Sequence, residues 1–307
     1  MPTIDLTTAP PPPRHALDGA PRRAGLTLAE LQLVAELAGG APLPFEVAPP
    51  TEADPMESRL GATPTSAESR VYRDAVAALP DAAESLVRRQ LLVDGRLDEG
   101  VAGAIGLLAT PTLALDIDVA AGGIQAKAWH RASAGAVASL ATVDGLVFEL
   151  AWFGVDGWPA ELGRVAALSE DIELRRSAVP SYVDLPFELA DAAAEARRSA
   201  RPDLVPVLVG RRSGSVVGPD GPLSDADAAR VLSALSSEAR GRLRALVADV
   251  SGEGLAAVGV VSWALLGDGW YALRPHRATE EQRVEIRRVE PADLAAVLAP
   301  VLAEAVR

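Results

Sequence analysis

Apolar residues near the start of the chain recur every three or four positions between residues 28 and 37. This spacing predicts an amphipathic helix. Thr27 and Glu30 have the spacing of a capping box at its start, and Gly39 and Gly40 favour its end. A Pro- and Gly-rich extended stretch follows over 41–64. The same helical spacing then predicts further helices over about 65–79, 81–93 and 101–108.

The pattern then changes to strict alternation. Residues 112–120 place apolar side chains on one face and Asp116 and Asp118 on the other, which predicts a half-buried strand. Three more strands are predicted over the segments IQAKAWHR, AVASLATV and LVFELAW. Gly122–Gly123 and Asp144–Gly145 supply hairpin turns among them. The first half therefore predicts a four-stranded antiparallel meander, closed by a helix near Pro159.

The second half repeats this order of elements. It predicts helices over 187–198, from Ser224, and around Leu243 and Val247, then strands over 255–266, 269–275 and 282–289, and a last helix from Pro291. The apolar run at 205–209 is interpreted as a short buried edge strand, with an exposed adhesive strip as the alternative.

Two sequence matches support an internal duplication. VASLATVDGLVFEL at 137–150 aligns with VVSWALLGDGWYAL at 260–273 when one inserted residue is allowed, and PAEL at 159–162 corresponds to PADL at 291–294. We predict an α+β fold: a duplicated helix/β-meander unit with pseudo-twofold symmetry, whose central antiparallel sheet is flanked by helical bundles. Two unrelated α+β halves with ordinary hairpins are the alternative.

Composition indicates a chain that is folded along most of its length, and this length fits one large or two small domains. Apolar residues make up 49% and charged residues 23% of the 307 positions. We predict a disordered Pro-rich tail over residues 1–24 and a single domain over 25–307, made of repeats 25–169 and 181–306. Without cysteine the chain forms no disulfide and no thiolate zinc site. No signal-peptide core or membrane-spanning stretch is visible, so a cytoplasmic location is expected.

The charge balance argues against polyanionic partners. Forty-two acidic and 29 basic residues give a formal charge of -13, and the arginines are scattered along the sequence. A protein of this charge repels nucleic acid and anionic lipid unless its cations cluster. We therefore expect neither nucleic-acid binding nor insertion into a membrane.

Residue types common in active sites occur here, but not in a catalytic arrangement. His15, His130 and His276 have no carboxylate and nucleophile at a recognisable spacing. Asp116 and Asp118 share a strand face, as a hard-cation site would need, but the neighbouring sequence suggests no further oxygen ligands. Ion pairing across neighbouring strands explains these aspartates better. The sequence predicts no catalytic residue and no metal site.

Four segments follow one another along the chain in a familiar order: LTLAELQLVAELAGGAPLPFEV, GATPTSAESR, LLATPTLALDIDV and VVSWALLGDGWYAL. Together they resemble the EspG family, the ESX (type VII) secretion-associated proteins of actinobacteria. The resemblance covers residues 26–305 and rests on the order of several weak motifs rather than on one signature.

The resemblance implies a cytosolic, substrate-specific chaperone that is not an enzyme and uses no cofactor. Proteins of this family bind PE–PPE heterodimers, cover the apolar tip of the helical PPE partner and keep the pair soluble until export. The expected partner of this chain is therefore a helical secretion substrate, such as a PE–PPE-like heterodimer. The chain itself is expected to be a monomer or a weak homodimer.

In the family, a loop between two central strands and the helical bundle of the second half contact the client. Carried onto this sequence, the expected partner-binding residues are Ala121, Gly122, Gly123, Ile124, Trp129, Val207, Val209 and Leu223. The turn at 121–124 is very short, which moves the expected contact toward the second-half helices or the 205–223 segment. Trp129 is expected on the solvated face of its strand.

Two other functions remain alternatives to a chaperone. An enzyme using the duplicated sheet as a small-molecule cleft predicts a pocket with converging polar groups and shifted pKa values. A structural subunit of a secretion complex predicts stable association with the secretion machine. A chaperone predicts a shallow apolar surface without such groups.

Overall fold

The computed structural model of the chain describes residues 20–46, 79–252 and 256–305. The first half contains β1 (Arg22–Thr27), α1 (Leu28–Leu37), α3 (Ala82–Arg88), β2 (Leu92–Val93), β3 (Arg96–Leu97), α4 (Glu99–Ala109), β4 (Leu113–Ala121), β5 (Ile124–Ser133), β6 (Ala136–Thr142), β7 (Val147–Gly154), the 3-10 turn η2 (Val155–Gly157) and α5 (Trp158–Ala166). The predicted helix over about 65–79 falls almost entirely outside the described residues.

The second half follows with the same order of elements. It contains β8 (Tyr182–Pro186), α6 (Phe187–Arg198), η3 (Pro202–Leu204), α7 (Val205–Arg211), β9 (Val217–Gly218), β10 (Gly221–Pro222), α8 (Asp225–Ser237), β11 (Gly241–Asp249), β12 (Ala256–Leu266), β13 (Gly269–Ala278), β14 (Glu281–Val289), η4 (Pro291–Asp293) and α9 (Leu294–Ala305). Each half thus runs strand, helices with a small hairpin, four-stranded meander and closing helix.

The strands of the two repeats lie in mirrored order on either side of the β4–β11 pair. Twelve strands form one sheet in the order β1-β7-β6-β5-β4-β11-β12-β13-β14-β8-β9-β10, and β2 and β3 form a separate hairpin. The equivalent strands β4 and β11 pair antiparallel in the middle, from Leu113 opposite Asp249 to Ala121 opposite Gly241. Outward from this pair, β5-β6-β7-β1 on one side matches β12-β13-β14-β8 on the other. The predicted α+β fold with a duplicated helix/meander unit is confirmed.

Contacts divide the chain into two compact units. One comprises residues 1–112 and 130–157, and the other comprises 113–129 and 158–307. The division passes through β5, so β4 belongs to the same unit as the second repeat. The predicted tail over 1–24 is described only from residue 20, and β1 already begins at Arg22.

The first unit packs its helices against β1, β6 and β7. Helix α1 contacts β1 and β7, and α4 contacts β6 and β7. The predicted capping box is confirmed, because the Glu30 amide donates to Thr27 Oγ1 at 3.2 Å and the Thr27 amide donates to Glu30 Oε2 at 2.8 Å. We call α1, α3 and α4 the first bundle.

A buried carboxylate lies inside the first bundle. The Arg89 guanidinium at the end of α3 donates to Glu30 Oε1 at 3.1 Å and to the Gly25 carbonyl at 2.6 Å. Burial raises the pKa of Glu30, but hydrogen bonds from Ser85 and from the Thr27 amide, with the charge of Arg89, outweigh it and hold the pKa below its usual value. Glu30 is therefore ionised at neutral pH.

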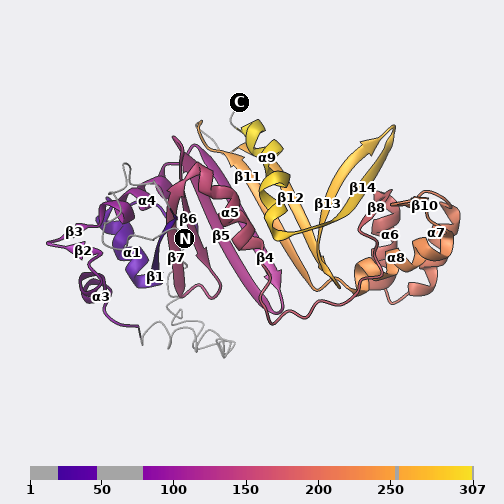
Figure 1. The fold of residues 1–307 in the computed structure, drawn as a ribbon, viewed down its shortest axis with the longest axis horizontal. Helices are drawn as coiled ribbons and strands as arrows, with labels where there is room; N and C mark the ends of the chain where they lie inside the picture. The colour runs from indigo at the N-terminus through magenta and orange to yellow at the C-terminus, as the bar shows by residue number, and fades with distance from the viewer. Residues whose placement is uncertain (1–19, 47–78, 253–255, 306–307) are drawn as a thin grey trace, which may run out of the picture. The chain divides into compact units, whose positions relative to one another are not determined.

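The second unit has its own bundle, formed by α6, α7 and α8 beside β8 and β14 (Figure 1). We call these helices the second bundle. Its core is apolar and joins helix residues to strand residues: Leu189, Ala193, Val205, Val209, Val231, Leu232, Val183, Leu185, Val284 and Ile286. Burial of this apolar surface is the main stabilising contribution there.

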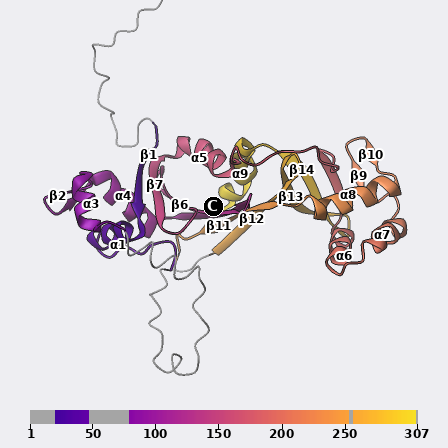
Figure 2. The same cartoon turned by 90° about the horizontal axis from the view of Figure 1, so that it is seen from below.

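The two closing helices also belong to the second unit and contact each other. Helices α5 and α9 lie over the same face of the strands (Figure 2), with α9 on β11 and β12. The Trp270 indole Nε1 donates to the Ala166 carbonyl at 2.9 Å and fastens β13 to the end of α5. Gly259 permits close approach of α9, because a Cβ there would lie 2.8 Å from Val301 Cγ1.

The prediction of a helix around Leu243 and Val247 is wrong, because this segment is strand β11. Its apolar residues satisfy helical spacing and alternation equally well. Pairing with β4 on one edge and β12 on the other decides the outcome, and it buries Leu243, Ala245 and Val247 on one face. A central strand is thus hidden in a sequence that reads as a helix.

The prediction of an edge strand at 205–209 is also wrong, because these residues form α7. Val205 and Val209 lie four residues apart and are both buried in the second bundle, whereas Val207 is exposed. Pro206 stands in the first turn of the helix, where its missing amide hydrogen costs nothing.

Because residues 241–249 form strand β11, the two repeats align differently from the alignment predicted from the sequence. Asp144–Gly145 joins β6 to β7, whereas Asp268–Gly269 joins β12 to β13, and these turns do not hold equivalent places in the mirrored order. The residue alignment of 137–150 with 260–273 is therefore shifted by one strand. PAEL at 159–162 and PADL at 291–294 do correspond, since both open the closing helices.

Candidate functional site

The β4–β5 hairpin ends in a two-residue turn. Gly122 and Gly123 both have positive φ, +60° and +81°, a backbone conformation that glycine adopts at the lowest steric cost. This is the geometry of a tight hairpin loop. On one side of the turn Ala121 is buried, and on the other Ile124 is 49% exposed. The sequence therefore places an apolar side chain at a short hairpin end.

The segment that links the two repeats runs beside this hairpin. The Ile172 side chain lies next to Gly122, where an added Cβ would be 3.1 Å from Ile172 Cγ1. The Arg240 guanidinium fixes the next residue, because its Nη1 donates to the Glu173 carbonyl at 2.6 Å. Leu174 then has an exposed side chain. Ile124 is thus exposed at a hairpin tip that the linker contacts through Ile172, and Leu174 is exposed two residues further along that linker.

Further polar contacts fix the linker to the β12–β13 turn. Glu238, the C-cap of α8, accepts hydrogen bonds from Ser177 Oγ at 2.6 Å and from the Ala178 amide at 2.9 Å. The Tyr271 hydroxyl lies 3.1 Å from the Val179 carbonyl and 3.0 Å from Asp268 Oδ1. Burial, reinforced by the Asp268 charge, raises the pKa of Tyr271 to about 12, so this hydroxyl keeps its proton.

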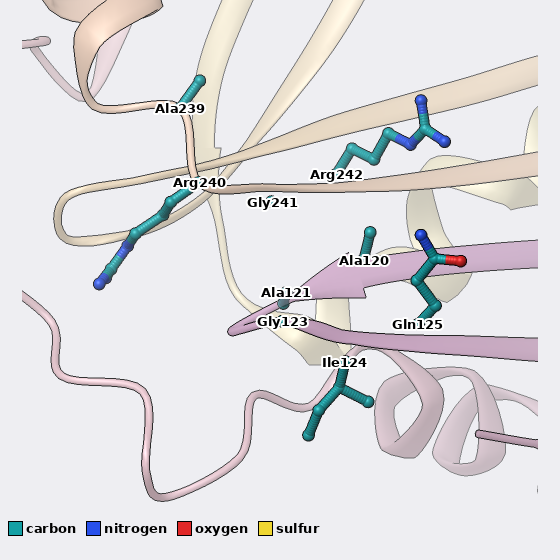
Figure 3. A pocket seen from close by; sticks show the side chains of 9 residues that line it. All are labelled: Ala120, Ala121, Gly123, Ile124, Gln125, Ala239, Arg240, Gly241 and Arg242. Carbon is teal, nitrogen blue, oxygen red and sulfur yellow. The ribbon is translucent and has the colours of Figure 1, made fainter. Parts of the chain in front are cut away.

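A shallow pocket of about 350 Å³ opens where this hairpin meets the start of β11 (Figure 3). Most of its lining residues are alanine or glycine, and the others are one isoleucine, one glutamine and two arginines: Ala120, Ala121, Gly123, Ile124, Gln125, Ala239, Arg240, Gly241 and Arg242. Gly241 sets the close spacing of the strands, because a Cβ there would lie 2.5 Å from the Ala120 carbonyl oxygen. Such a pocket accommodates an apolar side chain beside hydrogen-bond donors.

The predicted partner-binding residues fall into two places. Gly122 and Gly123 are exposed with Ile124 at the hairpin end, and Ala121 lies beneath them. Val207 is 53% exposed on α7. Val209, at 1%, is in the core of the second bundle, and Leu223 packs half-buried against it. The structure thus brings residues 121–124 together with β11 and leaves Val209 without access to a partner.

The expectation that Trp129 stands exposed on its strand is wrong, because its side chain is 9% exposed. Among the residues that line the pocket, those of the β11 side were not predicted from the sequence. Arg240, Gly241 and Arg242 follow a segment interpreted as helical, and nothing local indicates that they meet Gln125. The alternation of exposed arginines with buried apolar residues from Arg242 to Val247 was the available signal.

Within the described residues, His130, His276, Asp116 and Asp118 are not brought together as one reactive site, and His15 lies outside those residues. His276 Nε2 lies 3.1 Å from Asp184 Oδ1, and the Arg283 guanidinium donates to the same carboxylate at 3.1 Å, which is an ion-pair cluster on strands. His130 is buried within β5. Among the described residues, no three His, Asp or Glu side chains are grouped as metal ligands would be.

Comparison with known proteins adds a fold relationship. Neither a known protein-family model nor a curated protein sequence matches this chain. Among solved structures, a similar one is the Mycobacterium tuberculosis type VII secretion system chaperone EspG5 in complex with the PE25–PPE41 dimer, with a TM-score of 0.60 over 92% of this chain and 96% of that chain. The chain has an EspG-like fold. At 16% sequence identity, this similarity establishes the fold and not the partner.

The EspG-like fold agrees with the resemblance to the EspG family that the sequence shows. Among the described helices none could span a membrane, since none is both long enough and apolar enough.

Proposed function

We propose that this chain is a chaperone for a helical client of a type VII-like secretion system, a PE–PPE-like heterodimer or a protein of similar shape. The observation that carries the proposal is the exposed apolar end of the β4–β5 hairpin, set beside a shallow pocket on an EspG-like fold. The EspG5 structure contains a PE25–PPE41 dimer, and the fold is shared over nearly the whole chain.

The surface at the hairpin end suits a protein partner. Ile124 and Leu174 present apolar side chains, and the shallow pocket at the hairpin end and the start of β11 places alanine and glycine beside Gln125, Arg240 and Arg242. Exposed apolar residues gathered at one site mark partner surfaces on many soluble proteins. Linker contacts from Arg240 and Glu238 hold the surface in place before a client arrives, which lowers the entropic cost of binding.

A second contact area is proposed on the second bundle. Phe187 at the start of α6 and Val207 on α7 have exposed apolar side chains, whereas neighbouring Val205 and Val209 are buried. A helical client that reaches both the hairpin end and this bundle would bury more apolar surface than either area offers alone. We expect this chain to act in the cytoplasm, where a client would need protection before export.

The test is coexpression of the chain with helical secretion proteins from its own source, with the PE25–PPE41 dimer as a defined reference. A chaperone keeps at least one such protein soluble and elutes with it from a size-exclusion column. If every candidate client stays insoluble or elutes separately, while the chain is folded, the proposal is wrong. Coelution with secretion-machine components alone would point instead to a structural subunit.

The variant Ile124→Asp sharpens this test. A charge at the hairpin end should reduce the amount of coeluting client by about tenfold, because a desolvated contact then contains an unpaired carboxylate. Val147→Asp is the matched control: Val147 lies on β7 and is 50% exposed, against 49% for Ile124. Equal loss in both variants would show that the hairpin end is not the contact.

A further inference from the structure

Arg242 on β11 differs from the other exposed arginine of the same strand. Residues directly opposite in paired strands share a face of the sheet. Arg244 has Asp118 opposite it on β4, so an acidic residue occupies the paired position on the same face of the sheet. Arg242 has an alanine opposite it on both sides, Ala120 and Ala264. Throughout the described part of the chain, no carboxylate lies within ion-pair distance of Arg242.

Arg240, the other arginine of the pocket, is already bound. Its guanidinium donates to the carbonyls of Glu173 at 2.6 Å, Gly267 at 3.0 Å and Leu266 at 3.2 Å. These bonds make it part of the pocket wall and leave it little capacity for a ligand. Arg242 is exposed, and its guanidinium keeps its donors for a molecule that enters the pocket.

Gln125 supplies a second donor at the same place. Figure 3 shows the side chains of Gln125 and Arg242 projecting to one side of the hairpin, while Ile124 and Arg240 project to the other. The pocket between them has small residues, Ala120 and Gly241, among its lining. One side of the pocket therefore presents a guanidinium and an amide above an apolar surface.

We propose that this pocket recognises an acidic side chain of the client next to an apolar one. The apolar side chain packs on Ala120 and Gly241, the carboxylate accepts hydrogen bonds from the Arg242 guanidinium, and the Gln125 amide donates a further bond. Guanidinium matches carboxylate geometry with two parallel hydrogen bonds, which an amide or a lysine does not. This inference rests on the proposed chaperone function and names the chemistry that its client presents.

The charge of the whole chain makes such a contact selective. With a formal charge of -13, the surface as a whole repels an acidic client. An acidic tip is then accepted in the orientation that brings its carboxylate to Arg242, and other orientations are disfavoured. A basic tip would meet Arg242 as a like charge at the pocket.

The probe is a designed two-helix hairpin protein whose loop carries a leucine beside a glutamate, prepared also with glutamine or lysine in place of the glutamate. Binding of each probe to the full chain is measured by calorimetry at low and at high salt. We expect the glutamate probe to bind about tenfold more tightly than the glutamine probe, and the lysine probe to bind more weakly still. High salt should reduce the difference, because Arg242 is exposed.

Three variants of the chain complete the experiment. Arg242→Gln should abolish the preference for glutamate, and Arg242→Glu should reverse it in favour of lysine. Arg244→Gln removes the same charge from the same strand and should leave the preference unchanged. An unchanged preference in Arg242→Gln, an equal effect of Arg244→Gln, or equal or undetectable binding of all three probes would overturn the inference. Melting temperatures equal to that of the wild type show that the variants are folded.

The two proposals fail separately. A client that coelutes with the chain while the three probes bind alike would leave the chaperone standing and remove the acidic specificity. Glutamate-selective binding that depends on Arg242, without any client retained in coexpression, would support the specificity of the pocket and contradict the chaperone function.

Discussion

The two helical bundles have the same order of elements but different interiors. The first bundle, α1, α3 and α4, encloses the Glu30 carboxylate with its Arg89 and Thr27 partners. The interior of the second bundle, α6, α7 and α8, is a continuous apolar cluster. Its charges stay at the periphery, where Arg212 binds Glu188 and Glu281.

Their small hairpins differ in the same way. The β2–β3 hairpin of the first repeat forms a two-stranded sheet of its own, whereas β9 and β10 extend the large sheet from β8. The comparison shows that the order of elements is fixed by the duplicated plan, while the chemistry of each core is not. The first bundle should respond to pH and the second to lost apolar packing.

The largest effect is expected from a charge placed in the apolar bundle. Val209→Asp should lower the free energy of unfolding by about 4 kcal/mol or more, because it buries an unpaired carboxylate. Val207→Asp, two residues away on the exposed side of α7, should change it by about 0.5 kcal/mol or less. Urea unfolding followed by circular dichroism measures both. Similar losses would contradict the helical packing of α7.

An intermediate effect is expected where α4 meets β7 in the first unit. A Cβ at Gly100 would lie 2.8 Å from Trp152 Cζ2, so Gly100→Ala forces a rigid ring to move and should cost about 1–3 kcal/mol. Gly103→Ala on the same helix has open space around the new methyl group and should stabilise by about 0.5–1 kcal/mol. Thermal unfolding of the two variants shows whether each substitution raises or lowers the melting temperature. A rise in both would contradict the close packing of Gly100 against Trp152.

The smallest effect is the pH response of the first bundle. Because the pKa of Glu30 is lowered in the folded state, its ionised form contributes stability above the unfolded value near 4.5, and this contribution is lost as the pH falls through the folded pKa. Glu30→Gln should cost about 1 kcal/mol at neutral pH and almost nothing in strong acid.

The control for this variant is Glu36→Gln, on the exposed side of the same helix. It removes the same charge and should cost about 0.5 kcal/mol or less at neutral pH. Unfolding curves at neutral and acidic pH compare the two variants. A pH-independent cost for Glu30→Gln would show that the ion pair with Arg89 does not provide this stability.

Much of the fold is visible in local sequence chemistry. The capping box at Thr27 and the cap at Ser224 mark helix starts correctly, because their hydrogen bonds lie within three residues of the helix end. Strands with one wet face, such as β4, follow from alternation alone. The closing helices are marked by their matching PAEL and PADL segments. These signals suffice for the fold class and for most elements.

What could not be predicted depends on partners distant in the sequence. Pairing with β4 and β12 makes residues 241–249 a strand, and packing of Val205 and Val209 into the second bundle makes residues 205–211 a helix. The pocket needs Gln125 and Arg242 to meet across separate strands, so no local motif encodes it. The hairpin end at Ile124 was predictable as a turn, whereas the linker that supports it was not.

The antiparallel pair of β4 and β11 has a consequence for asymmetry. If two identical chains met at this line, both middle strands would carry the same side chains. Here the solvent-facing positions of β4 include Asp116 and Asp118, and those of β11 include Arg242 and Arg244. Because the two repeats are fused in one polypeptide, their equivalent central strands can differ, with acidic residues on β4 and basic residues on β11. A homodimer of either repeat would carry identical side chains on both strands and would lack this charge difference.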